Sequence, residues 1–222
     1  MDIYKNRRLV AKLAKNDFKT RYAGSYLGIV WAFIQPVITI LVYWFVFSVG
    51  FRSGTGDLGV PFVLYLVAGI VPWFFFQDAL VGGTNALLEY NYLVKKVVFN
   101  ISVRPVVKII SALFVHGFFV VFTIILYAFY GRCPDWYYLQ ILYYSICVFI
   151  LSLSLVYISC AVVVFFRDLT QIINIGLQVG VWLTPIMWVA DTALKDHPLI
   201  QKILQLNPMY YIVSGYRDAF VV

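Results

Sequence analysis

The sequence predicts an all-α fold, that of a polytopic helical membrane protein. Of the 222 residues, 63% are hydrophobic and only 12% are charged, about half the charged fraction of an ordinary soluble domain. The apolar runs are continuous and long enough for membrane-spanning helices. A transmembrane barrel would instead alternate apolar and polar residues along short strands, a pattern that these runs lack.

Positive charge is concentrated at the amino-terminal end. Seven of the seventeen Lys and Arg residues come before Ser25, which is the distribution of a topology signal rather than of a nucleic-acid-binding surface. With the amino terminus inside, the cytoplasmic segments hold twelve of these cations and the outer segments hold five. This bias predicts a multi-pass protein with a cytoplasmic amino terminus, which contacts membrane lipid and no nucleic acid.

Residues 1–22 form a basic arm before the first apolar run. Leu9, Val10, Leu13 and Ala14 recur at helical spacing, and Lys and Arg dominate the other side. This pattern predicts an amphipathic, interfacial helix on the cytoplasmic leaflet. A solvated basic tail is the alternative.

Residues 21–36 connect this arm to the first spanning helix. Gly24, Ser25 and Gly28 permit a sharp change of direction. Pro36 lies inside the span, and the backbone carbonyl that it leaves free must find another partner. We therefore expect a kink that faces protein or a cavity.

Five apolar runs are visible as candidate spans, and the chain reads as a single transmembrane domain over residues 1–222. An odd number of spans leaves the carboxyl end outside, and the apolar last residues predict a sixth span beyond them. Residues 86–99, between the second and third spans, have helical spacing, while residues 191–220 are too polar to span. The predicted spans are residues 26–49, 62–81, 106–130, 136–166 and 169–189.

The fifth predicted span is the most polar of the five. It carries Gln171, Asn174 and Gln178. Polar side chains within a membrane usually face the interior of a helix bundle or a water-filled cavity. The span is therefore expected to turn this side away from lipid.

The spans do not carry the residues of a membrane-embedded enzyme. His116 is the one histidine within a span, and Asp78 is the one carboxylate well inside one, so no metal pair or catalytic set is visible. We expect His116 to be a hydrogen-bonded packing residue. We expect Asp78 to pair with a cation or to cap a neighbouring helix, with a proton relay as the alternative.

Aromatic residues are unusually abundant, at 19% of the chain. Lipid contact and interfacial belts account for most of them. Some could instead line a path for sugars, because aromatic faces stack on the apolar C–H faces of pyranose rings. The sequence alone leaves both interpretations open.

Several short strings occur in order along nearly the whole chain. Together they resemble the membrane subunit of ABC exporters of the polysaccharide and polyol-phosphate class, which move O-antigen, capsular polysaccharide or teichoic acid. One departure is Phe99-Asn100, where the family often has Phe-Pro. The strings are RYAGS at residues 21–25, AGIVPWFFF at 68–76, NYLVKKVVF at 91–99, FRDL at 166–169, TPI at 184–186, and NP at 207–208 followed by Tyr216 and Arg217.

The resemblance implies a transport subunit, not an enzyme, in a bacterial or archaeal cytoplasmic membrane. Two copies would form a homodimer whose spans 1 and 5 line a channel for a lipid-linked glycan. The chain has no nucleotide-binding motif and would bind no cofactor, so ATP and Mg would bind a separate ABC ATPase subunit. The resemblance also implies short re-entrant helices near the exit in residues 191–220, and a sixth span.

The resemblance also assigns roles to residues, in three groups. Residues 86–99 would be the cytoplasmic coupling helix. The residues expected to couple to the ATPase are Leu87, Glu89, Tyr90, Asn91, Lys95 and Lys96. Those expected in the arm or a cytoplasmic gate are Arg21, Tyr22, Gly24, Arg167 and Asp168. The expected channel or cargo contacts are Trp31, Phe33, Tyr43, Trp44 and Trp182.

Two other function classes compete with this interpretation. An exporter of a drug, a lipid or another small molecule could use the same fold, because a fold does not fix the cargo. An ion channel or an intramembrane enzyme would need an ionisable pathway or a catalytic set, which the sequence lacks.

Overall fold

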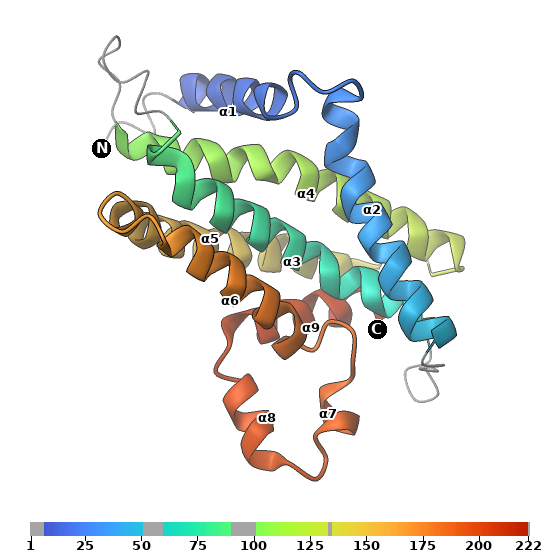
Figure 1. The fold of residues 1–222 in the computed structure, drawn as a ribbon. Helices are drawn as coiled ribbons and strands as arrows, with labels where there is room; N and C mark the ends of the chain where they lie inside the picture. The colour runs from blue at the N-terminus through green and yellow to red at the C-terminus, as the bar shows by residue number, and fades with distance from the viewer. Residues whose placement is uncertain (1–6, 51–59, 90–100, 133–134, 222) are drawn as a thin grey trace. The chain divides into compact units, whose positions relative to one another are not determined.

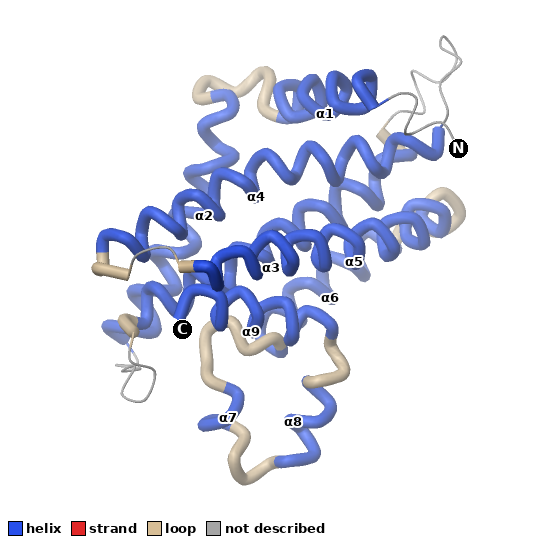
Figure 2. Tube along the Cα trace, turned by 180° about the vertical axis from the view of Figure 1, so that it is seen from behind, coloured by secondary structure: helices blue, strands red, loops and turns tan. Residues whose placement is uncertain are grey.

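The computed structural model describes residues 7–50, 60–89, 101–132 and 135–221, and these residues contain helices and no strand (Figure 1; Figure 2). The predicted all-α class is confirmed. Four helical segments are long and apolar enough to cross a membrane, and a fifth, Leu169–Leu183, is apolar but shorter. The four are Gly28–Gly50, Phe62–Leu87, Arg104–Phe129 and Trp136–Val163.

The helices follow the apolar runs of the sequence. The last apolar helix, α6, ends at Leu183, six residues before the predicted end of the fifth span. Of the predicted coupling helix, only a short 3-10 turn, Asn85–Leu87, is described, because residues 90–100 lie outside the described chain. The helices are α1 (Arg7–Arg21), α2 (Trp31–Trp44), α3 (Phe62–Thr84), α4 (Arg104–Phe129), α5 (Leu139–Val163), α6 (Leu169–Leu183), α7 (Ala190–Ala193), α8 (Pro198–Leu204) and α9 (Pro208–Val221).

The chain divides into two compact units. The first, which we call the arm unit, comprises Met1–Phe33, Phe75–Val115 and Phe149–Leu177. The second, which we call the tail unit, comprises Ile34–Phe74, His116–Val148 and Gln178–Val222. Helices α2 to α6 each contribute residues to both units.

In the arm unit, the apolar side of α1 packs against the beginning of α4. Val10 and Ala14 of α1 are buried in one cluster with Val103, Val106 and Val107. Burial of these side chains is the main source of stabilisation for such a contact. The apolar side of the arm therefore contacts protein rather than lipid, and its exposed side carries the basic residues.

The same unit holds α3 and α5 in close contact. A methyl group at Gly83 would collide with the side chain of Val156. One residue further on, the hydroxyls of Thr84 and Ser159 share a buried hydrogen bond of 2.7 Å. A small residue and a paired hydroxyl are typical of helices that approach closely within a membrane.

In the tail unit, the first half of α3 is buried, and α9 packs against α4. Leu66 and Val67 of α3 are fully buried. The hydroxyl of Tyr127 in α4 donates to the carbonyl of Leu64 at 3.1 Å. The ring of Tyr127 stacks on Phe220 of α9, with 4.7 Å between the ring centroids. Between α6 and α9, α7 and α8 form a loop that leaves the end of α6 and returns to α9 (Figure 1).

His116 is a packing residue, as predicted. Its side chain is buried in the tail unit, and Nε2 lies 2.9 Å from the hydroxyl of Tyr216 and 3.3 Å from that of Ser145. Tyr216 and Ser145 also hydrogen-bond each other. These contacts join α4, α5 and α9 through hydroxyl groups, which suits packing rather than metal binding.

The turn after α1 holds two glycines in backbone conformations that other residues rarely adopt. Gly24 has φ +99° and Gly28 has φ +53°, and a Cβ at either position would meet no atom within 4 Å. The two glycines therefore serve backbone conformation and not packing. Both positive φ values lie in the segment that was predicted to permit a change of direction after the arm.

Replacing Gly24 with alanine should lower the stability of the protein by about 1 kcal/mol, because left-handed backbone costs an L residue roughly that much. Gly28→Asn should cost less, since asparagine adopts φ values near +53° more readily. Thermal unfolding of the two purified variants tests the difference. An unchanged stability of Gly24→Ala would show that the backbone conformation is not the reason for glycine at residue 24.

Candidate functional site

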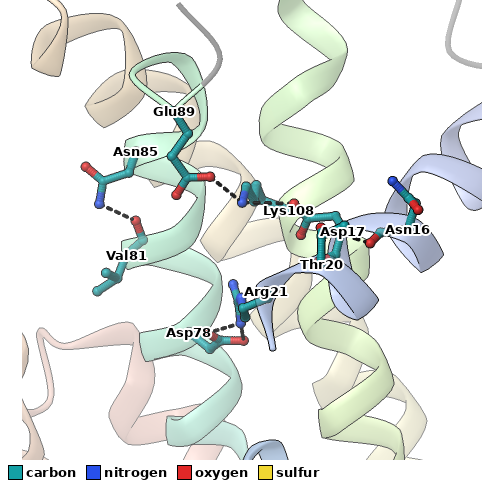
Figure 3. A network of polar contacts seen from close by, with 9 residues as sticks. All are labelled: Asn16, Asp17, Thr20, Arg21, Asp78, Val81, Asn85, Glu89 and Lys108. Atoms are coloured by element: carbon teal, nitrogen blue, oxygen red, sulfur yellow. Dashed lines mark hydrogen bonds and ion pairs between the residues drawn. The ribbon is translucent and has the colours of Figure 1, made fainter. Parts of the chain in front are cut away.

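Polar contacts of the arm unit converge on the last turns of α3 (Figure 3). Arg21, the last residue of α1, donates from Nη1 to both carboxylate oxygens of Asp78 in α3, at 2.7 and 2.8 Å. Both side chains are partly exposed. The predicted cation partner of Asp78 is thereby confirmed.

A second contact joins three segments through Lys108 of α4. Its Nζ lies 2.9 Å from Oδ1 of Asp17 in α1 and 2.6 Å from Oε2 of Glu89, which follows α3. The Lys108 and Asp17 side chains are 9% and 7% exposed, whereas that of Glu89 is 49% exposed. A buried ammonium group is tolerated when carboxylates neutralise it and accept its hydrogen bonds.

Helical spacing explains why the arm presents these groups to α3 and α4. Val10, Ala14, Asp17 and Arg21 are separated by four, three and four residues, so they lie on one side of α1. The stripe begins with apolar side chains and ends with charged ones. The apolar part packs on α4, and the charged part reaches Lys108 and Asp78.

The end of α3 is also tied to α5 and α6. Asn85 donates from Nδ2 to the carbonyl of Val81 at 3.0 Å. This bond orients the amide so that its oxygen accepts the hydroxyl of Thr170, in the first turn of α6, at 2.9 Å. The Thr84–Ser159 bond joins α5, and the Glu89–Lys108 ion pair joins α4. We call residues 84–89, which make these contacts, the α3 hub.

The electrostatics of the Arg21–Asp78 pair favour the charged guanidinium. Burial on its own would lower the pKa of Arg21, but the charge and the hydrogen bonds of Asp78 outweigh this and raise that pKa above its usual range. The arm is therefore held to α3 by an ion pair and not by a neutral contact.

The hub contains two of the six residues predicted to couple to an ATPase. Leu87 is half-buried in the 3-10 turn, and Glu89 bonds Lys108. Tyr90, Asn91, Lys95 and Lys96 lie outside the described residues. Leu87 and Glu89 therefore directly precede residues 90–96, which include the other four residues predicted to couple to the ATPase.

The predicted arm and gate residues are not brought together. Tyr22 packs edge-on against Phe18, with ring centroids 5.9 Å apart. Arg167 and Asp168 are exposed in the turn before α6, where the Asp168 carbonyl accepts the amide of Gln171. No ion pair joins either residue to the described part of the arm. The arm instead uses Arg21 to reach Asp78.

The aromatic residues predicted to contact cargo are mostly exposed. Trp31, Trp44 and Trp182 are 42%, 38% and 54% exposed. Phe33 and Tyr43 are half-buried. Tyr43 and Trp182 form an edge-on pair with 6.3 Å between ring centroids. The structure thus joins two members of this group, from α2 and α6.

Four functional candidates were not predicted from the sequence: Asp17, Lys108, Asn85 and Thr170. One signal was available for Lys108, which is the lone cation within a buried apolar run at the start of α4. Such a cation requires carboxylates or backbone carbonyls as partners. The other three resemble ordinary helix-surface residues in the sequence.

Comparison with known proteins identifies the family. The model of the ABC-2 type transporter family matches residues 8–221. The O-antigen export system permease protein RfbA of Myxococcus xanthus is 30% identical over 222 residues, which cover 99% of this chain and 82% of that protein. A protein of the same name from Klebsiella pneumoniae is 24% identical over 218 residues, with 96% and 80% covered. The chain belongs to the ABC-2 type transporter family, as a permease subunit.

Proposed function

We propose that this chain forms the transmembrane path of an exporter that moves a lipid-linked polysaccharide across the cytoplasmic membrane. The names of its relatives support a polysaccharide of the O-antigen kind as cargo. A second copy of the chain completes the path, and ATP is hydrolysed with Mg by a separate ABC ATPase subunit.

One observation carries the proposal: α6 has an exposed polar stripe. Gln171 and Gln178 are exposed and Asn174 is half-buried, and their spacing of three and four residues places them on one side of the helix. Polar amides facing lipid are unfavourable, because lipid offers them no hydrogen-bond partner. The stripe therefore suits a wet path for a hydroxyl-rich cargo.

The first span carries a similar exposed side. Trp31, Gln35 and Ile38 of α2 are exposed and lie at helical spacing. The tryptophan faces offer stacking surfaces, and the amide offers hydrogen bonds. This mixture of rings and amides suits a glycan better than a purely apolar cargo.

Conformational changes of the ATPase are transmitted to the transmembrane path through the α3 hub. The ATPase binds the segment that includes residues 90–96 and also the arm. From there, Asn85 contacts α6 through Thr170, and Glu89 contacts the arm through Lys108. A displacement at the coupling segment thus acts on the arm and on the polar helix together.

The distribution of charge supports a cytoplasmic arm unit. Twelve of the seventeen Lys and Arg residues fall in the arm unit and five in the tail unit. Cations are enriched on the cytoplasmic side of membrane proteins. The amino terminus and the α3 hub therefore face the ATPase in this proposal.

The function is tested with the purified permease and an ABC ATPase subunit from the same organism, reconstituted in liposomes. Lipid-linked glycans are expected to stimulate ATP hydrolysis or to compete with one another for stimulation. If no such glycan has either effect while a drug-like or lipid compound does, the protein is a small-molecule exporter and the glycan proposal fails.

The stripe on α6 gives a more specific test. Gln178→Leu is expected to lower glycan export about tenfold, which corresponds to about 1.4 kcal/mol of transition-state stabilisation, while insertion is unaffected. Ile175→Leu is the matched control, because Ile175 is also exposed on α6 but is apolar. Export from vesicles is the measurement. Equal export by the two variants would contradict a role for the stripe.

A further inference from the structure

Arg217 of α9 is a buried cation that has no carboxylate partner among the described residues. Its side chain is 7% exposed. The guanidinium donates to the carbonyl oxygens of Pro185 and Ile186, the latter at 2.6 Å, and Nε donates to that of Tyr65 at 3.4 Å. The guanidinium carbon also lies 3.6 Å from the centre of the Tyr65 ring, a distance at which a cation is attracted to the ring.

Two of the three carbonyls that Arg217 binds, those of Pro185 and Ile186, belong to the non-helical segment directly after α6. Residues 184–187 are buried, and the Ile186 amide turns back to the Thr184 carbonyl at 2.6 Å. Asn207, at the start of α9, donates to the Thr184 hydroxyl at 3.0 Å. Buried carbonyls outside a helix need donors from elsewhere, and α9 supplies them in this protein.

This arrangement depends on the shape of arginine and on the absence of a side chain opposite it. Two carbonyls of neighbouring residues match the planar fork of a guanidinium, whereas lysine offers a single nitrogen. A Cβ at Gly69 of α3 would lie 2.7 Å from Nη2 of Arg217. Gly69 therefore leaves the space that the guanidinium occupies.

We propose that Arg217 is a positioning residue that fixes residues 184–186 and thereby sets where α6 ends. Three strings of the sequence meet at this one side chain: the Gly69 string, Thr184-Pro185-Ile186, and Asn207 with Arg217. Because its partners are neutral carbonyls, Arg217 holds the segment without an ion pair. The consequence for transport rests on the proposed function, in which α6 borders the path. The fixing of residues 184–186 by Arg217 does not depend on the proposed function.

The test measures access to the segment in the full chain, assembled with its ATPase in liposomes. Ile186→Cys is introduced after the native cysteines are replaced by serine, and the rate of reaction with a water-soluble maleimide is recorded. Ile186 is fully buried, so labelling should be slow. Arg217→Lys and Arg217→Gln should each raise the rate about tenfold, by local opening of the segment.

A substitution at Gly69 of α3 tests the same contact of Arg217. Gly69→Ala should raise the labelling rate in the presence of Arg217, because its methyl group displaces the guanidinium. Combined with Arg217→Gln, it should add little. Gly117→Ala is the matched control, since a Cβ at this helical glycine meets no atom within 4 Å, and its labelling should remain slow.

Wild-type labelling rates in Arg217→Lys and Gly69→Ala, in folded complexes, would overturn the proposal. These two variants decide the matter even if Arg217→Gln fails to fold. Fast labelling with reduced export per ATP would support both the positioning role and its link to transport. Fast labelling in a complex that no glycan stimulates would retain the positioning role and reject the glycan cargo.

Discussion

Replacing Lys108 with methionine is expected to weaken the packing of α1 on α4. The change removes the cation between two carboxylates, one of which, Asp17, is 7% exposed. Oδ2 of Asp17 already lacks a hydrogen-bond partner among the described residues. Losing one member of a buried ion pair typically costs about 3 kcal/mol. That is enough to loosen the packing of α1 on α4, which otherwise depends on a few valine and alanine contacts, although the Arg21–Asp78 pair remains.

Hydrogen exchange of the α1 amides is the measurement for Lys108→Met, with ATP hydrolysis and export recorded on the same sample. Lys12→Met is the matched control, because Lys12 is exposed on the outer side of α1. Adding Asp17→Asn to Lys108→Met should restore part of the protection by removing the unpaired charge. Unchanged exchange in Lys108→Met would show that the ion pairs of Lys108 do not hold the arm.

Glu89→Ala should behave differently from Lys108→Met. Glu89 is 49% exposed, and half-exposed ion pairs contribute little to stability. Asp17 also remains paired with Lys108 in this variant. We therefore expect normal folding and protected α1 amides, together with a loss of coupling between ATP hydrolysis and export.

Thr170→Val is expected to separate ATP hydrolysis from export without unfolding the protein. The change keeps the size of the side chain and removes the donor to Asn85. A single hydrogen bond contributes about 1 kcal/mol, which is a small part of the stability. It is a large part of an allosteric coupling energy, which is typically about 1–3 kcal/mol. Export per ATP should fall several-fold while ATP hydrolysis continues.

Thr123→Val is the matched control for this prediction. Thr123 is a buried threonine whose hydroxyl bonds within its own helix, to the Phe119 carbonyl at 2.7 Å. Asn85→Ala should reproduce the Thr170→Val defect, and the double variant should add nothing further, because both changes remove one shared bond. Additive defects would place the two residues in separate roles.

The fold class could be predicted because it depends on local sequence. Continuous apolar runs of sufficient length leave a helical membrane protein as the consistent solution. A cation partner for Asp78 was one of the roles predicted from its position in an apolar helix. The identity of that cation could not be predicted, since Arg21 lies 57 residues away and one basic residue of the arm resembles another.

The parts that could not be predicted depend on contacts between distant segments. The amphipathic pattern of α1 is the same whether its apolar side meets lipid or the valines of α4. The apolar composition continues past Leu183, so the predicted span was longer than α6. The helix ends there because Pro185 lacks an amide hydrogen and because Arg217 supplies donors to the carbonyls that follow.

The packing of α1 on α4 also constrains how the protein is made. Val10 and its partner Val103 are separated by about ninety residues, so a ribosome finishes the arm and the first two spans before α4 exists. During that interval the surface of α4 is not yet present to cover the apolar side of the arm, and the membrane surface is the apolar environment available to it. Its transfer to α4 is therefore a late step of biogenesis. The packing of α1 on α4 can form only after the third apolar helix has been synthesised and inserted.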